Sequence, residues 1–129
     1  MNKTKILVID DEEDFLDLMR NGLEPQGYEV ITATDGTNGL AKAKVSKPDL
    51  VICDIKMPKK DGFQVLKEMR QDAELRRIPF IMLTVVDEFK KVEEAYDEEA
   101  DFYVTKPVKF DVLLKNISLL LNLQKAKKE

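Results

Sequence analysis

Five short apolar runs, separated by stretches with helical spacing, constrain the fold of this chain more than any other feature. The runs cover residues 5–9, 29–33, 50–53, 80–84 and 102–105. The first, third and fourth are almost continuously apolar, which is typical of parallel strands buried on both faces. Strict alternation of strand and helix predicts a doubly wound α/β fold, with a parallel sheet covered by helices on both faces. The length of 129 residues fits a single domain, 1–129.

Five helices are expected between and after these strands. The apolar positions that define the first four are Phe15, Leu18, Met19 and Leu23; Leu40, Ala43 and Val45; Phe63, Leu66 and Met69; and Phe89, Val92 and Tyr96. Gly27 and Pro48 are expected to lie just beyond the ends of the first and second helices. The fifth helix is predicted over about residues 110–124.

The composition excludes several classes of site. A chain with one cysteine and no histidine has no internal disulfide, no His-based metal site and no Ser–His catalysis. The net charge of −4 argues against direct nucleic-acid binding by this domain. No run of eighteen apolar residues is present, so no membrane span is expected, and a cytoplasmic location is predicted. We expect Cys53 to lie in the buried core of its strand.

The residues at the strand ends carry the chemistry. Asp10 and Asp11 follow the first run, Asp54 the third, Thr84 ends the fourth, and Lys106 follows the fifth. In a parallel sheet these ends point the same way, and ligands bind beside them. The sequence therefore predicts that three carboxylates, a hydroxyl and an amine converge on one crevice.

Clustered carboxylates repel one another and need a cation. A set of oxygen ligands with few protein carboxylates suits Mg²⁺. A carboxylate beside Mg²⁺ and Lys106 can attack phosphorus to form an aspartyl phosphate, with Asp54 as the nucleophile. Read alone, the acidic residues that start at Asp10 could simply favour the N-terminus of a helix.

With these residues in order, the chain resembles the receiver domains of two-component response regulators over essentially its whole length. The matching residues are Ile6-Leu7-Val8-Ile9-Asp10-Asp11, Asp49-Leu50-Val51-Ile52-Cys53-Asp54, Met57-Pro58, Asp61-Gly62, Thr84, Tyr103 and Lys106-Pro107. The resemblance implies a flavodoxin-like, CheY-like sheet of order 2-1-3-4-5 with five helices. It also implies a phosphoacceptor switch rather than an enzyme, with a sensor histidine kinase or a histidine phosphotransfer protein as the donor.

The resemblance further implies roles for individual residues. Asp10, Asp11, Asp54 and the backbone carbonyl of Lys56 would surround Mg²⁺. Thr84 would move toward the phosphoryl group and Tyr103 would turn inward, while Lys106 would assist the reaction. The Lys106-Pro107 bond is often cis in such domains.

Two rival functions fit the sequence less well. A flavin-type binding module would need a loop rich in Gly, Ser or Thr after the first strand, where this chain has five acidic residues. A phosphatase with an Asp nucleophile would need a second acid two residues after it, where this chain has Lys56. Turnover of a phosphodonor separates a phosphatase from a receiver.

Two further features bear on rate and output. Val85 follows Thr84 where receivers commonly have a smaller residue, and we expect it to narrow access to Asp54. On the fifth helix, a second apolar line of Val112, Leu119 and Leu123 lies off the core face of Phe110, Leu113, Leu114, Ile117, Leu120 and Leu121. The second line is either covered by neighbouring helices or part of a partner surface formed by the fourth helix, fifth strand and fifth helix, for a homodimer or an output domain.

Overall fold

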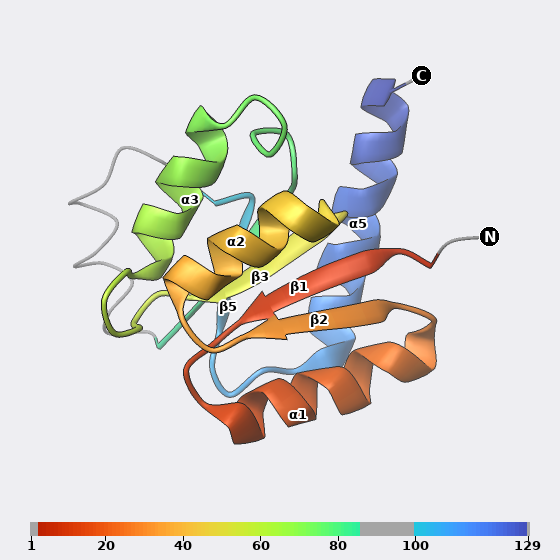
Figure 1. Cartoon of the computed structure of the whole chain (residues 1–129). Helices are drawn as coiled ribbons and strands as arrows, with labels where there is room; N and C mark the ends of the chain where they lie inside the picture. The colour runs from red at the N-terminus through yellow and green to blue at the C-terminus, as the bar shows by residue number, and fades with distance from the viewer. Residues whose placement is uncertain (1–2, 86–99, 129) are drawn as a thin grey trace.

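The computed structural model describes residues 3–85 and 100–128, which form one five-stranded parallel sheet flanked by helices (Figure 1). The strand order is β2-β1-β3-β4-β5, so the doubly wound fold expected from the sequence is confirmed. The elements are β1 (Lys5–Ile9), α1 (Glu13–Leu23), a 3₁₀ turn (Glu24–Gln26), β2 (Glu29–Ala33), α2 (Gly36–Ser46), β3 (Leu50–Asp54), α3 (Gly62–Gln71), β4 (Phe80–Thr84), β5 (Phe102–Thr105) and α5 (Phe110–Lys128). The expected helix around Phe89, Val92 and Tyr96 lies outside the described residues.

Two elements are longer than the sequence predicts. The strand β3 includes Asp54, and α5 continues four residues past 124 to Lys128. Elsewhere the helix ends follow local backbone chemistry. Lys47 adopts a left-handed conformation (φ 47°) after α2, directly before Pro48, and Gly27 (φ 96°) follows the 3₁₀ turn after α1.

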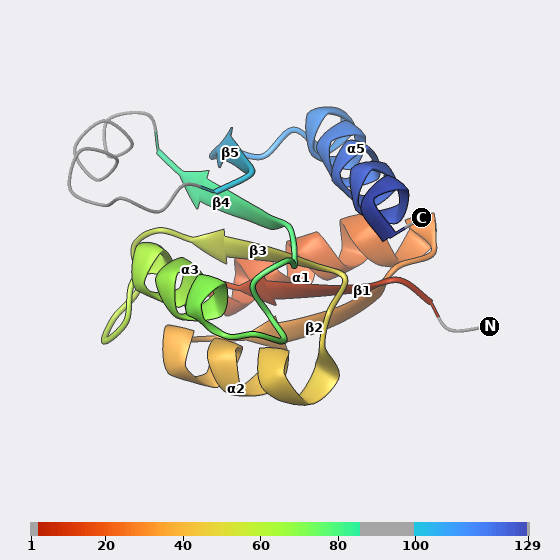
Figure 2. The same ribbon diagram turned by 90° about the horizontal axis from the view of Figure 1, so that it is seen from above.

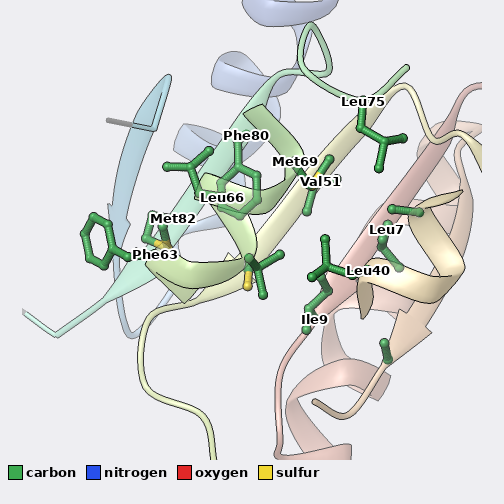
Figure 3. Packing of buried hydrophobic residues seen from close by; sticks show 14 of the residues in the cluster. Leu7, Ile9, Leu40, Val51, Phe63, Leu66, Met69, Leu75, Phe80 and Met82 are labelled. Atoms are coloured by element: carbon green, nitrogen blue, oxygen red, sulfur yellow. The ribbon is translucent and has the colours of Figure 1, made fainter. Parts of the chain in front are cut away.

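Each face of the sheet buries alternate residues of the same strands. In β1, Ile6 and Val8 pack on the face covered by α1 and α5, whereas Leu7 and Ile9 pack on the face covered by α2 and α3. Figure 2 shows α2 and α3 on one side of the sheet and α5 on the other. Burial on both faces explains the continuous apolar runs, and Figure 3 shows the cluster under α2 and α3.

Two of the apolar residues that predict the first and second helices are exposed in the structure. The side chain of Leu18 is 52% exposed, and that of Val45 is 87% exposed. In α1 the buried residues are Leu16, Met19 and Leu23, which lie on one stripe at helical spacing. Leu18 lies two residues from Leu16, about 200° around the helix axis, and so faces solvent.

The expected core face of α5 is confirmed. Leu113, Ile117 and Leu120 are buried, and Phe110, Leu114 and Leu121 pack against the same cluster. The second apolar line remains exposed: Val112, Leu119 and Leu123 retain 45%, 49% and 51% of their accessible surface. Within the described part of the chain, no helix combines the length and apolar character needed to cross a membrane.

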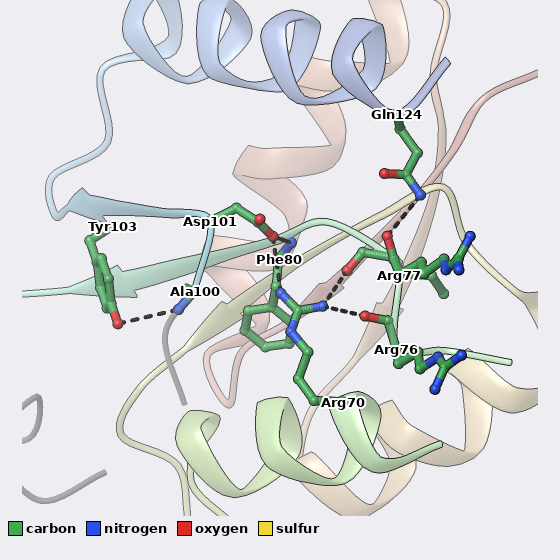
Figure 4. Close-up of polar contacts among 9 residues, drawn as sticks. Arg70, Arg76, Arg77, Phe80, Ala100, Asp101, Tyr103 and Gln124 are labelled. Atoms are coloured by element: carbon green, nitrogen blue, oxygen red, sulfur yellow. Dashed lines mark hydrogen bonds and ion pairs between the residues drawn. The ribbon is translucent and has the colours of Figure 1, made fainter. Parts of the chain in front are cut away.

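The amino ends of β4 and β5 are joined by a network of polar contacts around Arg70 (Figure 4). The Arg70 guanidinium donates to the carbonyl oxygens of Arg76 (3.0 Å) and Ile78 (2.9 Å) and to the carboxylate of Asp101 (3.1 Å). The same Asp101 oxygen accepts a hydrogen bond from the Phe80 N–H at 2.7 Å. At the amino ends of the strands, here called the amino edge of the sheet, hydrogen-bond donors and acceptors are therefore matched.

Candidate functional site

The opposite edge of the sheet gathers the polar residues that the strand ends predicted. Asp10 follows β1, Asp54 ends β3, Thr84 ends β4 and Lys106 follows β5. The strands are all parallel, so these residues share the carboxyl edge. Asp10 and Asp54 lie at the carboxyl ends of the neighbouring strands β1 and β3, where the strand order reverses. Open α/β sheets bind ligands at this place.

The Lys106 ammonium joins the two carboxylates. Its Nζ lies 2.9 Å from Asp10 Oδ2 and 3.4 Å from Asp54 Oδ2. The three side chains are largely withdrawn from water, with exposures of 18% for Lys106, 0% for Asp10 and 13% for Asp54. Partial burial alone would lower the pKa of Lys106, but the hydrogen bond to Asp10 and the charges of Asp54 and Asp10 raise it above its ordinary value. Lys106 is therefore a fixed positive charge.

Asp10 also belongs to a cluster of three acidic residues. Carboxylate oxygens of Asp10, Asp11 and Glu12 all lie within 4.8 Å of one another. The Glu12 N–H donates to Asp10 Oδ1 at 2.9 Å, which folds the start of the loop back onto the buried carboxylate. Asp11 and Glu12 are exposed, and both line an open hollow of about 520 Å³ with Glu13, Asp14 and Thr34. Glu12 was not among the metal ligands proposed from the sequence.

The environment of Asp54 favours its neutral form. Burial is the largest cause, and the charges of Asp10 and Asp11 add to it, while Lys106 acts in the opposite sense. Together they raise the pKa of Asp54 to about 6. A carboxylate held in this way is stabilised by an additional cation, which is the behaviour expected of a site for Mg²⁺.

The side chains of Thr84 and Tyr103, the two switch residues expected from the sequence, form hydrogen bonds with nearby backbone groups. The buried Thr84 hydroxyl donates to the Val85 carbonyl at 2.9 Å. The Tyr103 hydroxyl accepts a hydrogen bond from the Ala100 N–H at 3.3 Å (Figure 4). The centroid of the Tyr103 ring lies 6.5 Å from that of the Phe63 ring. Val85 is 41% exposed at the end of β4.

Close packing fixes the loop between Asp54 and α3. The Gly62 N–H donates to the Ile55 carbonyl at 2.8 Å, which closes the loop that contains Lys56. A Cβ on Gly62 would overlap the carbonyl oxygen of Asp54 and lie 2.7 Å from Met82 Sδ, so only glycine fits. Lys60 in this loop pairs with Glu68 of α3. The expected cis Lys106-Pro107 bond is confirmed.

Cys53 precedes Asp54 in β3 and faces the cluster under α2 and α3. Its thiol is fully buried and donates weakly to the Asp54 carbonyl at 3.3 Å. Burial is the main reason that the pKa of this thiol is raised well above its ordinary value, with a further contribution from the charge of Asp54. The expectation of a buried core cysteine is confirmed.

Comparison with known proteins gives one consistent result. The sequence model of the response regulator receiver domain matches residues 6–118. Over 108 residues, 83% of the chain, the sequence is 49% identical to the alkaline phosphatase synthesis transcriptional regulatory protein PhoP of Bacillus subtilis (strain 168). The chain covers 43% of that regulator's length. It is also 37% identical to protein PilH of Pseudomonas aeruginosa over 117 residues, covering 91% of this chain and 97% of PilH.

Solved structures have the same fold. The chemotaxis response regulator CheY4 of Vibrio cholerae superimposes with a TM-score of 0.81 and 32% identity, covering 92% of this chain and 99% of CheY4. A putative response regulator from Chloroflexus aurantiacus gives a TM-score of 0.86 and 26% identity, covering 94% and 99% of the two chains.

Proposed function

The chain belongs to the response regulator receiver domain family of two-component systems, and from this premise we propose that Asp54 accepts a phosphoryl group. The donor is the phosphohistidine of a sensor histidine kinase or a histidine phosphotransfer protein. One observation carries the proposal: Lys106 bridges Asp10 and Asp54 at the carboxyl edge of the sheet, at 2.9 and 3.4 Å. The expected cytoplasmic location belongs to the same proposal.

The reaction is an in-line displacement at phosphorus. An Asp54 carboxylate oxygen forms the new bond to phosphorus, the bond to the donor breaks, and its electron pair leaves with the donor group. Lys106, already 3.4 Å from Asp54 Oδ2, can donate to a phosphoryl oxygen without leaving Asp10. Phosphoryl transfer depends mainly on such positioning and charge neutralisation.

The residues around Asp54 fit a magnesium ion. Asp10, Asp11 and Asp54, with the backbone carbonyl of Lys56, would hold it, and Glu12 is close enough to Asp10 and Asp11 to contribute through water. Bound Mg²⁺ supplies positive charge to the phosphoryl oxygens. The raised pKa of Asp54 supports this assignment, because burial, with the added charges of Asp10 and Asp11, outweighs Lys106 and disfavours the charged carboxylate.

The response to phosphorylation would begin at Thr84. Its hydroxyl would exchange the Val85 carbonyl for a phosphoryl oxygen, and Tyr103 would then repack near Phe63. The change would reach the exposed apolar line of Val112, Leu119 and Leu123 on α5, within an output surface that includes β5 and α5. The fourth helix expected from the sequence, which lies outside the described residues, belongs to the same proposed surface. The partner is a second copy of the chain or an output domain. Relatives such as PhoP are named as transcriptional regulators, and this chain spans less than half of PhoP.

Intact-mass measurement tests the proposal. With Mg²⁺ and acetyl phosphate, the wild-type mass should rise by one phosphoryl group, and Asp54→Asn or chelation of Mg²⁺ should abolish the increase. Asp17→Asn, which changes an exposed carboxylate of α1, is the matched control and should label normally. Labelling of the Asp54→Asn protein at another residue would contradict the assignment. Continuous turnover of the donor without a stable adduct would instead support the phosphatase.

The output surface has a separate test. Beryllofluoride with Mg²⁺ should promote self-association, measured by sedimentation, and Leu119→Lys should block it while labelling at Asp54 continues. Val45→Lys, a matched change at an exposed apolar residue of α2, should leave association unchanged. Association that survives Leu119→Lys would place the interface elsewhere.

A further inference from the structure

The third group around the Lys106 ammonium is an aromatic ring. Lys106 Nζ lies 4.4 Å from the centroid of the Phe15 ring, within the range of a cation–π interaction. Phe15 belongs to the first turn of α1, directly after the acidic residues that follow β1. The ring, Asp10 and Asp54 therefore contact one ammonium from three elements.

Core packing alone does not account for this position. The buried stripe of α1 consists of Leu16, Met19 and Leu23, whereas Phe15 is only partly buried and lies at the margin of that cluster. A lysine ammonium on a flexible four-carbon stem could otherwise turn toward the exposed carboxylates of Asp11 or Glu12. An aromatic face attracts the cation and leaves its N–H groups for stronger acceptors.

We propose that Phe15 is a positioning residue, which holds the Lys106 ammonium between Asp10 and Asp54 so that it meets the incoming phosphoryl group. This inference rests on the proposed function of Asp54 and adds a residue to it. The effect requires an aromatic face, so it distinguishes Phe15 from a residue that only fills volume. Misplacing a charged group by a fraction of its contact distance lowers the rate of transfer more than the affinity for the donor.

The test compares Phe15→Leu, which keeps apolar bulk, with Phe15→Tyr, which keeps the aromatic face. Phe110→Leu is the matched control, because Phe110 is also partly buried against the same cluster and packs on Gly22 of α1. With acetyl phosphate and Mg²⁺, the maximal labelling rate of Phe15→Leu should fall about fivefold, with an unchanged half-saturating donor concentration. Phe15→Tyr and Phe110→Leu should stay within about twofold of wild type.

A second readout does not depend on phosphorylation. In the wild type and in Phe15→Tyr, NMR should show the ε-methylene protons of Lys106 shifted upfield by the ring current, and Phe15→Leu should abolish the shift. Equal maximal rates for Phe15→Leu and Phe110→Leu, or no ring-current shift in the wild type, would overturn the inference. Failure of the wild type to label would refute the proposed function, while the NMR comparison would still decide whether Phe15 positions Lys106.

Discussion

At the amino ends of the strands, Arg70 and Asp101 satisfy each other and the surrounding backbone, whereas at the carboxyl ends Lys106 serves two carboxylates at once. Both edges belong to one sheet and both contain a cation beside acidic groups. At the amino edge each donor has a matched acceptor, so removing one residue leaves the hydrogen-bonding groups of the others without a partner. At the carboxyl edge, burial and the neighbouring carboxylates together disfavour the charged form of Asp54 despite Lys106, so neutralising Asp54 should relieve that cost. The contacts at the amino edge therefore stabilise the fold, whereas the carboxyl edge favours the binding of an additional cation.

The largest effect is expected at the amino edge. Asp101→Ala removes the acceptor of the Phe80 N–H and the partner of Arg70, and should lower the free energy of unfolding by about 2 kcal/mol. Urea unfolding measures the change. Phosphorylation of Asp54 should be unaffected, and Asp17→Ala, an exposed control on α1, should stay within about 0.5 kcal/mol of wild type. Equal stability of the Asp101→Ala protein would remove the contrast between the edges.

The opposite sign is expected for Asp54→Asn without metal. Because the folded state raises the pKa of Asp54 from 3.8 to about 6, this residue's contribution to stability is present below pH 4 and lost as the pH rises through 6. At pH 7.5 the variant should therefore be more stable, by ~1–2 kcal/mol after allowing for solvent screening. The gain should disappear near pH 4.

The matched change at the amino edge is Asp101→Asn. It should lower stability at pH 7.5, because one amide oxygen replaces a carboxylate that serves both Arg70 and the Phe80 N–H. Melting temperatures between pH 4 and 8 measure both variants. A lower stability of the Asp54→Asn protein would show that Lys106 already offsets the cost of the charged Asp54 carboxylate.

Magnesium should act at one edge only. At a concentration ten times the dissociation constant, Mg²⁺ should stabilise the wild type by about 1.4 kcal/mol. Asp11→Asn should reduce the gain by weakening binding, whereas Asp101→Asn should retain it. Thermal unfolding in a Mg²⁺ series measures the effect. An equal gain in all three proteins would indicate binding outside the acidic cluster.

The smallest effect concerns access to the carboxyl edge. Val85→Ala should speed labelling by acetyl phosphate two- to threefold, equivalent to about 0.5 kcal/mol in the barrier. Val45→Ala, at a more exposed position on α2, should not change the rate. Identical rates for Val85→Ala and wild type would show that Val85 does not narrow the site.

The sequence predicted which residues gather at the carboxyl edge better than it predicted the contacts among their side chains. Parallel strands that end in Asp10, Asp54 and Thr84 converge because of topology, which alternating apolar runs reveal. The partner of each group depends on side-chain geometry that spacing does not encode. The approach of Phe15 to Lys106 and the addition of Glu12 to the acidic cluster were therefore missed.

The periodicity of apolar residues located α1 but did not specify which of its residues are buried. In α1, Phe15, Leu18, Met19 and Leu23 have helical spacing, but the sheet selects the overlapping set that contains Leu16. Periodicity defines a stripe to within one residue, and packing decides which neighbour is buried. The network around Arg70 also escaped prediction, because two of its acceptors are backbone carbonyls that carry no sequence signal.

The rate at which the buried Cys53 thiol is chemically modified reports how often β3 opens. A disulfide reagent reaches this thiol only when β3 separates from α2 and α3, so the rate of modification measures a partial unfolding event one residue from Asp54. The sequence has a single cysteine, so the kinetics come from one site and no residue has to be replaced first. Any ligand that stabilises the carboxyl edge should slow the modification of Cys53. The ratio of the modification rates without and with the ligand gives the free energy by which the ligand stabilises the closed state of the central strand β3.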